Sequence, residues 1–195
     1  MIEIVGALAF VASAVAILPQ ARRVLRTGET GGVSPDWAML GAISTAAWTI
    51  YTALRGLWWA TVADAIASAS YLITVAALVR RAAVPRWWAA ALWAGLFVAA
   101  ATTGGLNLVG AVLSVAFVVQ ITPSIVVAFR SDEVDGISSA TWMLVAFEGA
   151  LWLAYGVGRN DNAVVAFGAI ALLAGTTILL RVSVWSGERF SWWRA

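Results

Sequence analysis

The sequence contains no cysteine, no histidine and no lysine in 195 residues, and only 11% of its residues are charged. The absence of cysteine excludes disulfides and thiolate metal sites. The absence of histidine removes the commonest metal ligand and the usual proton carrier at neutral pH. The sequence also lacks a nucleophile paired with a base and any cofactor motif. We therefore expect neither an enzyme nor a protein that holds a metal or another cofactor.

Apolar residues dominate what is present. They make up 62% of the chain, and the mean hydropathy is +0.89. A helix needs roughly 17 to 25 apolar residues to cross the ~30 Å hydrocarbon core of a bilayer. The sequence therefore predicts an all-α integral membrane protein with seven transmembrane helices, at residues 3–25, 36–54, 59–79, 87–103, 106–129, 140–157 and 163–181.

The twelve basic residues, all arginines, indicate how these helices are oriented. If the N-terminus is outside, only Arg55 and Arg159 lie outside and the other ten arginines lie on the cytoplasmic side. This is the bias known as the positive-inside rule. We expect a multi-pass protein of the cell membrane with a cytoplasmic C-terminus and the lipid bilayer as its surroundings. Since topology explains the net charge of +2, no nucleic-acid partner is indicated.

Tryptophans fall near several predicted helix ends, where indole rings favour the headgroup level of a bilayer. We expect these residues to be interface anchors: Trp37, Trp58, Trp59, Trp87, Trp88, Trp142 and Trp185.

The chain contains an internal repeat. Residues 4–80 align with residues 108–184 at a constant shift of 104 without gaps, and the matched positions include proline, tryptophan, tyrosine and arginine. We divide the chain into a first three-helix repeat (1–82), a linker helix (83–105), a second three-helix repeat (106–184) and a cytoplasmic tail (185–195). Four crossings separate equivalent helices, so the repeats are parallel, as in some secondary transporters.

A proline lies at the same place in the first helix of each repeat. Pro19 and Pro123 lack an N–H group, and each ring clashes with the carbonyl four residues earlier. Two such kinks could act as hinges that open a path to the cytoplasm. The alternative is that they merely bend their helices, as prolines commonly do in membranes. We assign Gln20 and Gln120, close to these prolines, to the same gate region.

The sequence has Leu18-Pro19-Gln20, then a charged turn, and then Trp48 and Tyr51, and this pattern is duplicated around a single linker helix. The pattern resembles the PQ-loop and SWEET superfamily of small-solute carriers. The resemblance implies alternating access, a pocket between the two three-helix units and prolines as hinges of an inner gate. This sequence departs from the pattern at Thr122-Pro123-Ser124, which lacks the glutamine. Asp64 and Gly168 stand where many sugar-carrying members have asparagine.

Two acidic residues lie inside predicted membrane helices, Asp64 and Glu148. An ionisable side chain there costs at least ~2.5–3.5 kcal/mol on insertion scales, which favours a functional role. Three roles are open: acceptors for substrate hydroxyls, groups that couple transport to protons, or structural groups in salt bridges, such as Asp64 with Arg55. We expect Arg55 and Arg159 to reach the outer headgroups or to pair with Asp64 or Asp161.

Helical spacing places further residues beside these acids. Glu148, Trp152 and Tyr155 form one stripe, and Trp48 and Tyr51 form the matching stripe of the first repeat. The alternative for the aromatic residues is helix packing. The candidate substrate-binding residues are Trp48, Tyr51, Asp64, Ser68, Glu148, Trp152 and Tyr155.

The leading functional hypothesis is a transporter of a small polar solute, first of all a sugar. The alternative is a proton-coupled transporter of an amino acid or similar zwitterion, as in cystinosin-like members. A receptor or scaffold that does not transport, similar to the KDEL receptor, is disfavoured because the short loops offer little surface to a protein. Small residues in the predicted helices 59–79 and 106–129 leave room for a homo-oligomer.

Overall fold

The computed structural model describes residues 1–27, 34–81, 83–130 and 138–185. Throughout these ranges the chain is helical or forms short turns, which confirms the predicted all-α class. The elements are α1 (Ile2–Thr27), α2 (Pro35–Leu54), α3 (Trp58–Arg80), α4 (Trp87–Arg130), α5 (Ser139–Arg159) and α6 (Asn162–Trp185). Their bounds lie within a few residues of the predicted helices.

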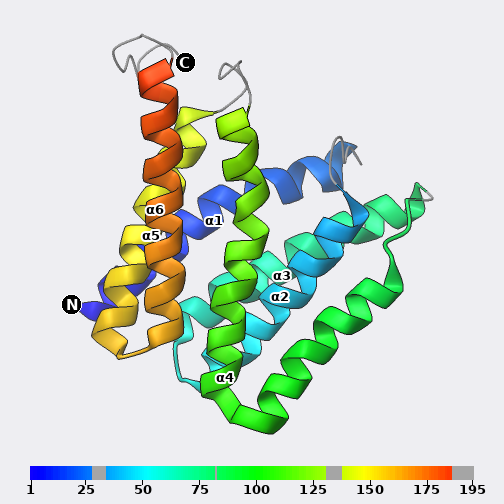
Figure 1. Cartoon of the computed structure of the whole chain (residues 1–195), viewed down its shortest axis with the longest axis horizontal. Helices are drawn as coiled ribbons and strands as arrows, with labels where there is room; N and C mark the ends of the chain where they lie inside the picture. The colour runs from blue at the N-terminus through cyan, green and yellow to red at the C-terminus, as the bar shows by residue number, and fades with distance from the viewer. Residues whose placement is uncertain (28–33, 82, 131–137, 186–195) are drawn as a thin grey trace.

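The long element α4 consists of two helices that meet at Gly105. This residue has φ 61° and ψ −157°, a backbone conformation that glycine adopts without the steric cost of a Cβ atom. Figure 1 shows the two parts of α4 as the arms of a V. The described residues therefore form seven helices, with the linker helix before Gly105 and the first helix of the second repeat after it.

Several helices have the length and apolar character of membrane spans. In the described ranges these are α3, the segment Trp87–Thr122 of α4, α5 and α6, and Ile2–Ile17 is a shorter apolar helix. In α2, which is richer in hydroxyl groups, Thr45, Thr49 and Thr52 donate hydrogen bonds to the carbonyl oxygens four residues earlier, at 2.8–2.9 Å. These bonds satisfy the hydroxyl groups within the helix, as a hydrocarbon environment requires.

The two repeats start their second helices in the same way. The Ser34 side chain accepts a hydrogen bond from the backbone N–H of Trp37, and Ser138 accepts one from that of Thr141. Pro35 follows Ser34 at the first helical position, where its missing N–H is not needed. A serine cap thus fixes the entry into α2 and into α5.

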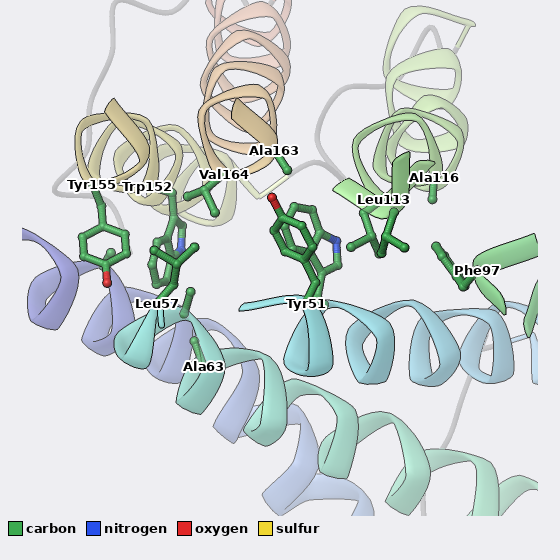
Figure 2. Packing of buried hydrophobic residues seen from close by; sticks show 14 of the residues in the cluster. Tyr51, Leu57, Ala63, Phe97, Leu113, Ala116, Trp152, Tyr155, Ala163 and Val164 are labelled. Atoms are coloured by element: carbon green, nitrogen blue, oxygen red, sulfur yellow. The ribbon is translucent and has the colours of Figure 1, made fainter. Parts of the chain in front are cut away.

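The three-helix units pack against one another through an aromatic core. Tyr51, Leu57, Leu113, Trp152 and Tyr155 belong to this core, which Figure 2 shows between helices of both units. Equivalent glycines allow close approach. A Cβ atom added at Gly6 would lie 2.6 Å from Cε2 of Tyr155, and one added at Gly110 would lie 3.0 Å from the Tyr51 hydroxyl. Each tyrosine therefore packs against the first helix of the other unit.

The predicted hinge residues lie inside helices. The helical backbone of α1 continues through Pro19 and Gln20, and that of α4 continues through Pro123. The side chains of these three residues lie outside the described part of the structure. A hinge at the two prolines stays a prediction.

Candidate functional site

A cavity of about 350 Å³ lies between the two three-helix units. Its walls come from α1, α2 and α3 of the first unit and from the second part of α4, α5 and α6 of the second unit. Among the described residues, none from Trp87 to Gly105 lines it. The volume falls in the range usual for sites that bind small molecules.

The cavity wall combines aromatic rings, hydroxyl groups and two acids. Four indole rings line it, those of Trp37, Trp48, Trp142 and Trp152. Asp64 and Glu148 are the charged residues of the lining, within the part of the chain that the structure describes. The two carboxyl groups come from different units, Asp64 from α3 and Glu148 from α5.

Glu148 is held by a small hydrogen-bond network that crosses between the units. The Ser13 hydroxyl of α1 donates to the Glu148 carboxylate. The Trp152 indole nitrogen lies 3.2 Å from the same carboxylate oxygen and 3.1 Å from the Ser13 hydroxyl oxygen. Donors from α1 and α5 thus orient an acceptor that faces the cavity.

Ser44 occupies the position in the first unit that Glu148 occupies in the second. Its hydroxyl oxygen accepts hydrogen bonds from the Trp93 indole nitrogen at 2.9 Å and from the Gln120 side-chain nitrogen at 2.7 Å. Gln120, which we expected in the gate region, therefore lies on the cavity wall. The two halves of the cavity have related positions but different chemistry.

Tyr51 and Asp161 connect the units at one end of the cavity. The Tyr51 hydroxyl lies 2.8 and 3.0 Å from the two Asp161 carboxylate oxygens, and both residues are buried. Asp161 also accepts hydrogen bonds from the backbone N–H groups of Ala163 and Val164, at 3.1 and 3.0 Å. Arg55 lies 3.7 Å from Asp161 and donates to Asn107 as well.

Arg159 is the repeat equivalent of Arg55, and it reaches from the second unit to the first. Its guanidinium lies 3.3 Å from the Glu3 carboxylate and donates to the Gly56 carbonyl at 2.8 Å. Glu3 also accepts a hydrogen bond from the Trp59 indole nitrogen, at 2.9 Å. Glu3 and Asn107 are related by the repeat shift, so each arginine reaches the first helix of the other unit.

We call this group of six residues the latch: Glu3, Tyr51, Arg55, Asn107, Arg159 and Asp161. They lie at the ends of helices that share one side of the molecule, together with the N-terminus and the bend of α4 (Figure 1). Four of the six are residues with a formal charge, two acidic and two basic. The latch therefore joins the two units at one end through polar contacts.

The structure brings together part of the predicted binding set. Trp48, Asp64, Glu148 and Trp152 line the cavity, whereas Tyr51, Ser68 and Tyr155 do not. Tyr51 belongs to the latch and Tyr155 packs against Gly6. The Ser68 hydroxyl lies 3.5 Å from the Ala42 carbonyl oxygen of α2. Tyr51, Ser68 and Tyr155 thus belong to helices that line the cavity, but they are not among the lining residues.

The structure adds contacts for other residues that the sequence singled out. Trp37 and Trp142, expected as interface anchors, line the cavity, because a position near a helix end does not fix the direction of the ring. Arg55 pairs with Asp161, an alternative that the sequence left open, and Asp64 lies instead near Thr52. Ser13 was missed, although a serine inside the apolar run of α1 was the available signal.

Comparisons with known proteins agree with this architecture. Residues 1–61 match the PQ loop repeat family. The structure is similar to that of a eukaryotic SWEET transporter, with a TM-score of 0.70 and 15% sequence identity, over 96% of this chain and 99% of the other. The chain has the SWEET transporter fold. A comparison with curated proteins finds no match.

The SWEET fold confirms the seven-helix membrane architecture in a 3+1+3 arrangement that the apolar runs and the internal repeat predicted. The protein is thus a multi-pass membrane protein.

Proposed function

We propose that the protein moves a small polar solute across a membrane by alternating access between its two three-helix units. The observation that carries the proposal is the cavity, to which every helix of both units contributes. A site built from two bodies changes shape when they rock against each other. The SWEET transporter fold and the PQ loop repeat support the same function.

The shape of the cavity supports a state that is closed at the latch. Ala60 and Val164, in the first turns of α3 and α6, line its end nearest the latch, and Thr74 lines it far along α3. From Ala60 to Thr74 the helix rises about 21 Å. The cavity thus extends from the latch toward the opposite end. With the orientation expected from the arginines, the latch is the outer gate and the cavity extends toward the cytoplasm.

In the proposed cycle, the latch contacts break while the opposite ends of the units close. Residues 1–82 and 106–184 would be the moving units, 83–105 the linker and 185–195 a cytoplasmic tail. Pro19 and Pro123 would provide the hinges. Trp48, Asp64, Glu148 and Trp152 would contact the solute.

The resemblance favours a sugar as the solute, with stacking on the indole rings and hydroxyl groups bound by the carboxylates. The two acids facing the cavity favour a second candidate, proton-coupled transport of an amino acid or similar zwitterion. A flux whose pH dependence is lost in Asp64→Asn or Glu148→Gln would favour coupling. A flux independent of pH would contradict it.

The natural absence of cysteine provides a direct test of alternating access. Ala67→Cys places one thiol in the cavity wall, and membrane-impermeant maleimide is added to one side of sealed vesicles at a time. We expect labelling mainly from the cytoplasmic side, and a gain of labelling from the outside when Tyr51→Phe is added. The unaltered chain controls for reaction at other groups. Outside labelling that does not respond to Tyr51→Phe would contradict the proposal.

A further inference from the structure

We infer that the cavity selects a small organic cation, with a protonated amine or quaternary ammonium group on a compact apolar body. This inference rests on the proposed transport function and specifies the class of solute. It departs from the sugar that the resemblance implies, and it follows from the charges and rings of the cavity wall.

The first argument is charge. Asp64 and Glu148 face the cavity from opposite units, and the described lining holds no arginine to balance them. The nearby arginines at the latch are already engaged, Arg55 with Asp161 and Arg159 with Glu3. A buried carboxylate without a counter-charge is unfavourable, so a cationic solute gains more from this cavity than a neutral one.

The second argument is the aromatic lining. Trp48 and Trp152 occupy equivalent positions in the two units, and Trp37 and Trp142 add two more indole rings. Tryptophan is the best of the aromatic side chains at attracting a cation, and several such rings together bind quaternary ammonium groups. The indole rings can contact the apolar body of such a solute, and the two acids can contact its cationic group.

The third argument excludes a solute that carries its own carboxylate. The anionic end of a zwitterion is bound best by a donor with positive charge, and the described lining provides neutral donors: Gln120, hydroxyl groups and indole N–H groups. Gln120 already donates to Ser44, and Ser13 donates to Glu148. An amine without a carboxylate therefore fits better than an amino acid.

Two neighbouring side chains orient Glu148 as an acceptor for the cationic group. Ser13 and Trp152 both donate to its carboxylate, which fixes the direction of the acid and places no positive charge beside it. The hydrogen bonds come from two different units, so the geometry of the acceptor depends on how the units are placed. Binding of a cation at Glu148 would thereby favour the arrangement in which Ser13 of α1 and Trp152 of α5 meet.

The test compares probes that differ in one feature. Choline is set against 3,3-dimethylbutan-1-ol, its neutral isostere, against glycine betaine, which keeps the trimethylammonium and adds a carboxylate, and against glucose. Ethanolamine distinguishes a protonated amine from a quaternary ammonium group. Thermal unfolding of the purified full chain reports binding, and proteoliposomes with radiolabelled choline or glucose report flux. We expect stabilisation by choline or ethanolamine, none by the isostere or betaine, and flux of the cation.

Variants locate the binding. Asp64→Asn and Glu148→Gln each keep the side-chain shape and remove a charge, and each should raise the dissociation constant for the cation at least tenfold. Asp36→Asn is the matched control, since Asp36 forms an ion pair with Arg86 at 2.7 Å and is not among the residues that line the cavity. This control should bind as the parent does. If one cavity variant does not fold, the other tests the same prediction.

Four results would overturn the inference. They are equal stabilisation by choline and its neutral isostere, preferential stabilisation by betaine, cation binding unchanged in both cavity variants, and no response to any cation. Flux of glucose without flux of a cation would overturn the inference and leave the proposed transport function standing. Flux of neither solute, with no stabilisation by any probe, would contradict both.

Discussion

Tyr51 donates its phenolic hydrogen to Asp161 and so joins the end of α2 in one unit to the start of α6 in the other. The repeat-related Tyr155 is equally buried, but within the described residues its hydroxyl group has no hydrogen-bond partner. The difference arises because Leu57 stands in the first unit where Asp161 stands in the second. The two equivalent tyrosines therefore differ in role: Tyr51 forms a polar link between the units, and Tyr155 packs against Gly6.

Replacing Tyr51 by phenylalanine should destabilise the closed state of the latch. The variant leaves the buried Asp161 carboxylate without its hydroxyl donor, and a hydrogen bond to a charged group contributes about 1.5–3 kcal/mol. We expect the midpoint of thermal unfolding in detergent to fall.

Tyr155→Phe is the matched control. It removes the same atom from a buried site without a described partner, so the thermal midpoint should stay the same or rise. Equal losses in the two variants would mean that the Tyr51–Asp161 bond does not hold the units together.

The glycines at the crossing of the units should be sensitive to a single methyl group. In Gly6→Ala the new Cβ atom would lie 2.6 Å from Cε2 of Tyr155 and 2.7 Å from Cδ1 of Trp59, so the rings must move. Overpacking of this kind typically costs 1–3 kcal/mol. We expect a lower thermal midpoint and a rise in labelling of Ala67→Cys from the latch side.

Gly95→Ala is the control for the glycine substitution. A Cβ atom there meets no heavy atom within 4 Å, and alanine is the better helix former by about 1 kcal/mol. The thermal midpoint should not fall. If Gly6→Ala were as well tolerated as Gly95→Ala, the first helix would not lie as close to Tyr155 as the structure places it.

Much of the fold was predictable from the sequence because it rests on local features. Apolar runs fixed the helix bounds to within a few residues, serine caps marked the starts of α2 and α5, and the repeat showed which helices are equivalent. The bend at Gly105 lies between the predicted helices 87–103 and 106–129. These signals depend on residues close in the chain.

The site was less predictable because its contacts join residues far apart in the chain. Helical spacing identified Trp48, Asp64, Glu148 and Trp152, but it could not separate a cavity face from a neighbouring packing face, as Tyr155 illustrates. The link from Ser13 to Glu148 spans 135 residues. Only the relative placement of α1 and α5 brings the two together.

The salt bridge between Glu3 and Arg159 should contribute less than the buried part of the latch. Its side chains are 56% and 34% exposed, and exposed ion pairs are typically worth 0.2–1 kcal/mol. A double-mutant cycle with Glu3→Gln and Arg159→Gln, read by thermal unfolding, should give a coupling energy in that range. The coupling should shrink as salt is raised. A coupling larger than the effect of Tyr51→Phe would place the main contact of the latch here instead.

The two prolines should matter for motion more than for stability. The backbone is helical through Pro19 and Pro123, so alanine at both positions can restore the missing N–H and should leave the thermal midpoint unchanged or raise it. If the prolines are hinges, the straightened helices should slow the exchange between states. In Ala67→Cys carrying Pro19→Ala and Pro123→Ala, we expect slower labelling from the latch side after Tyr51→Phe opens it. Each single proline variant should give an intermediate rate. Labelling as fast as in the variant that keeps both prolines would show that they only bend their helices.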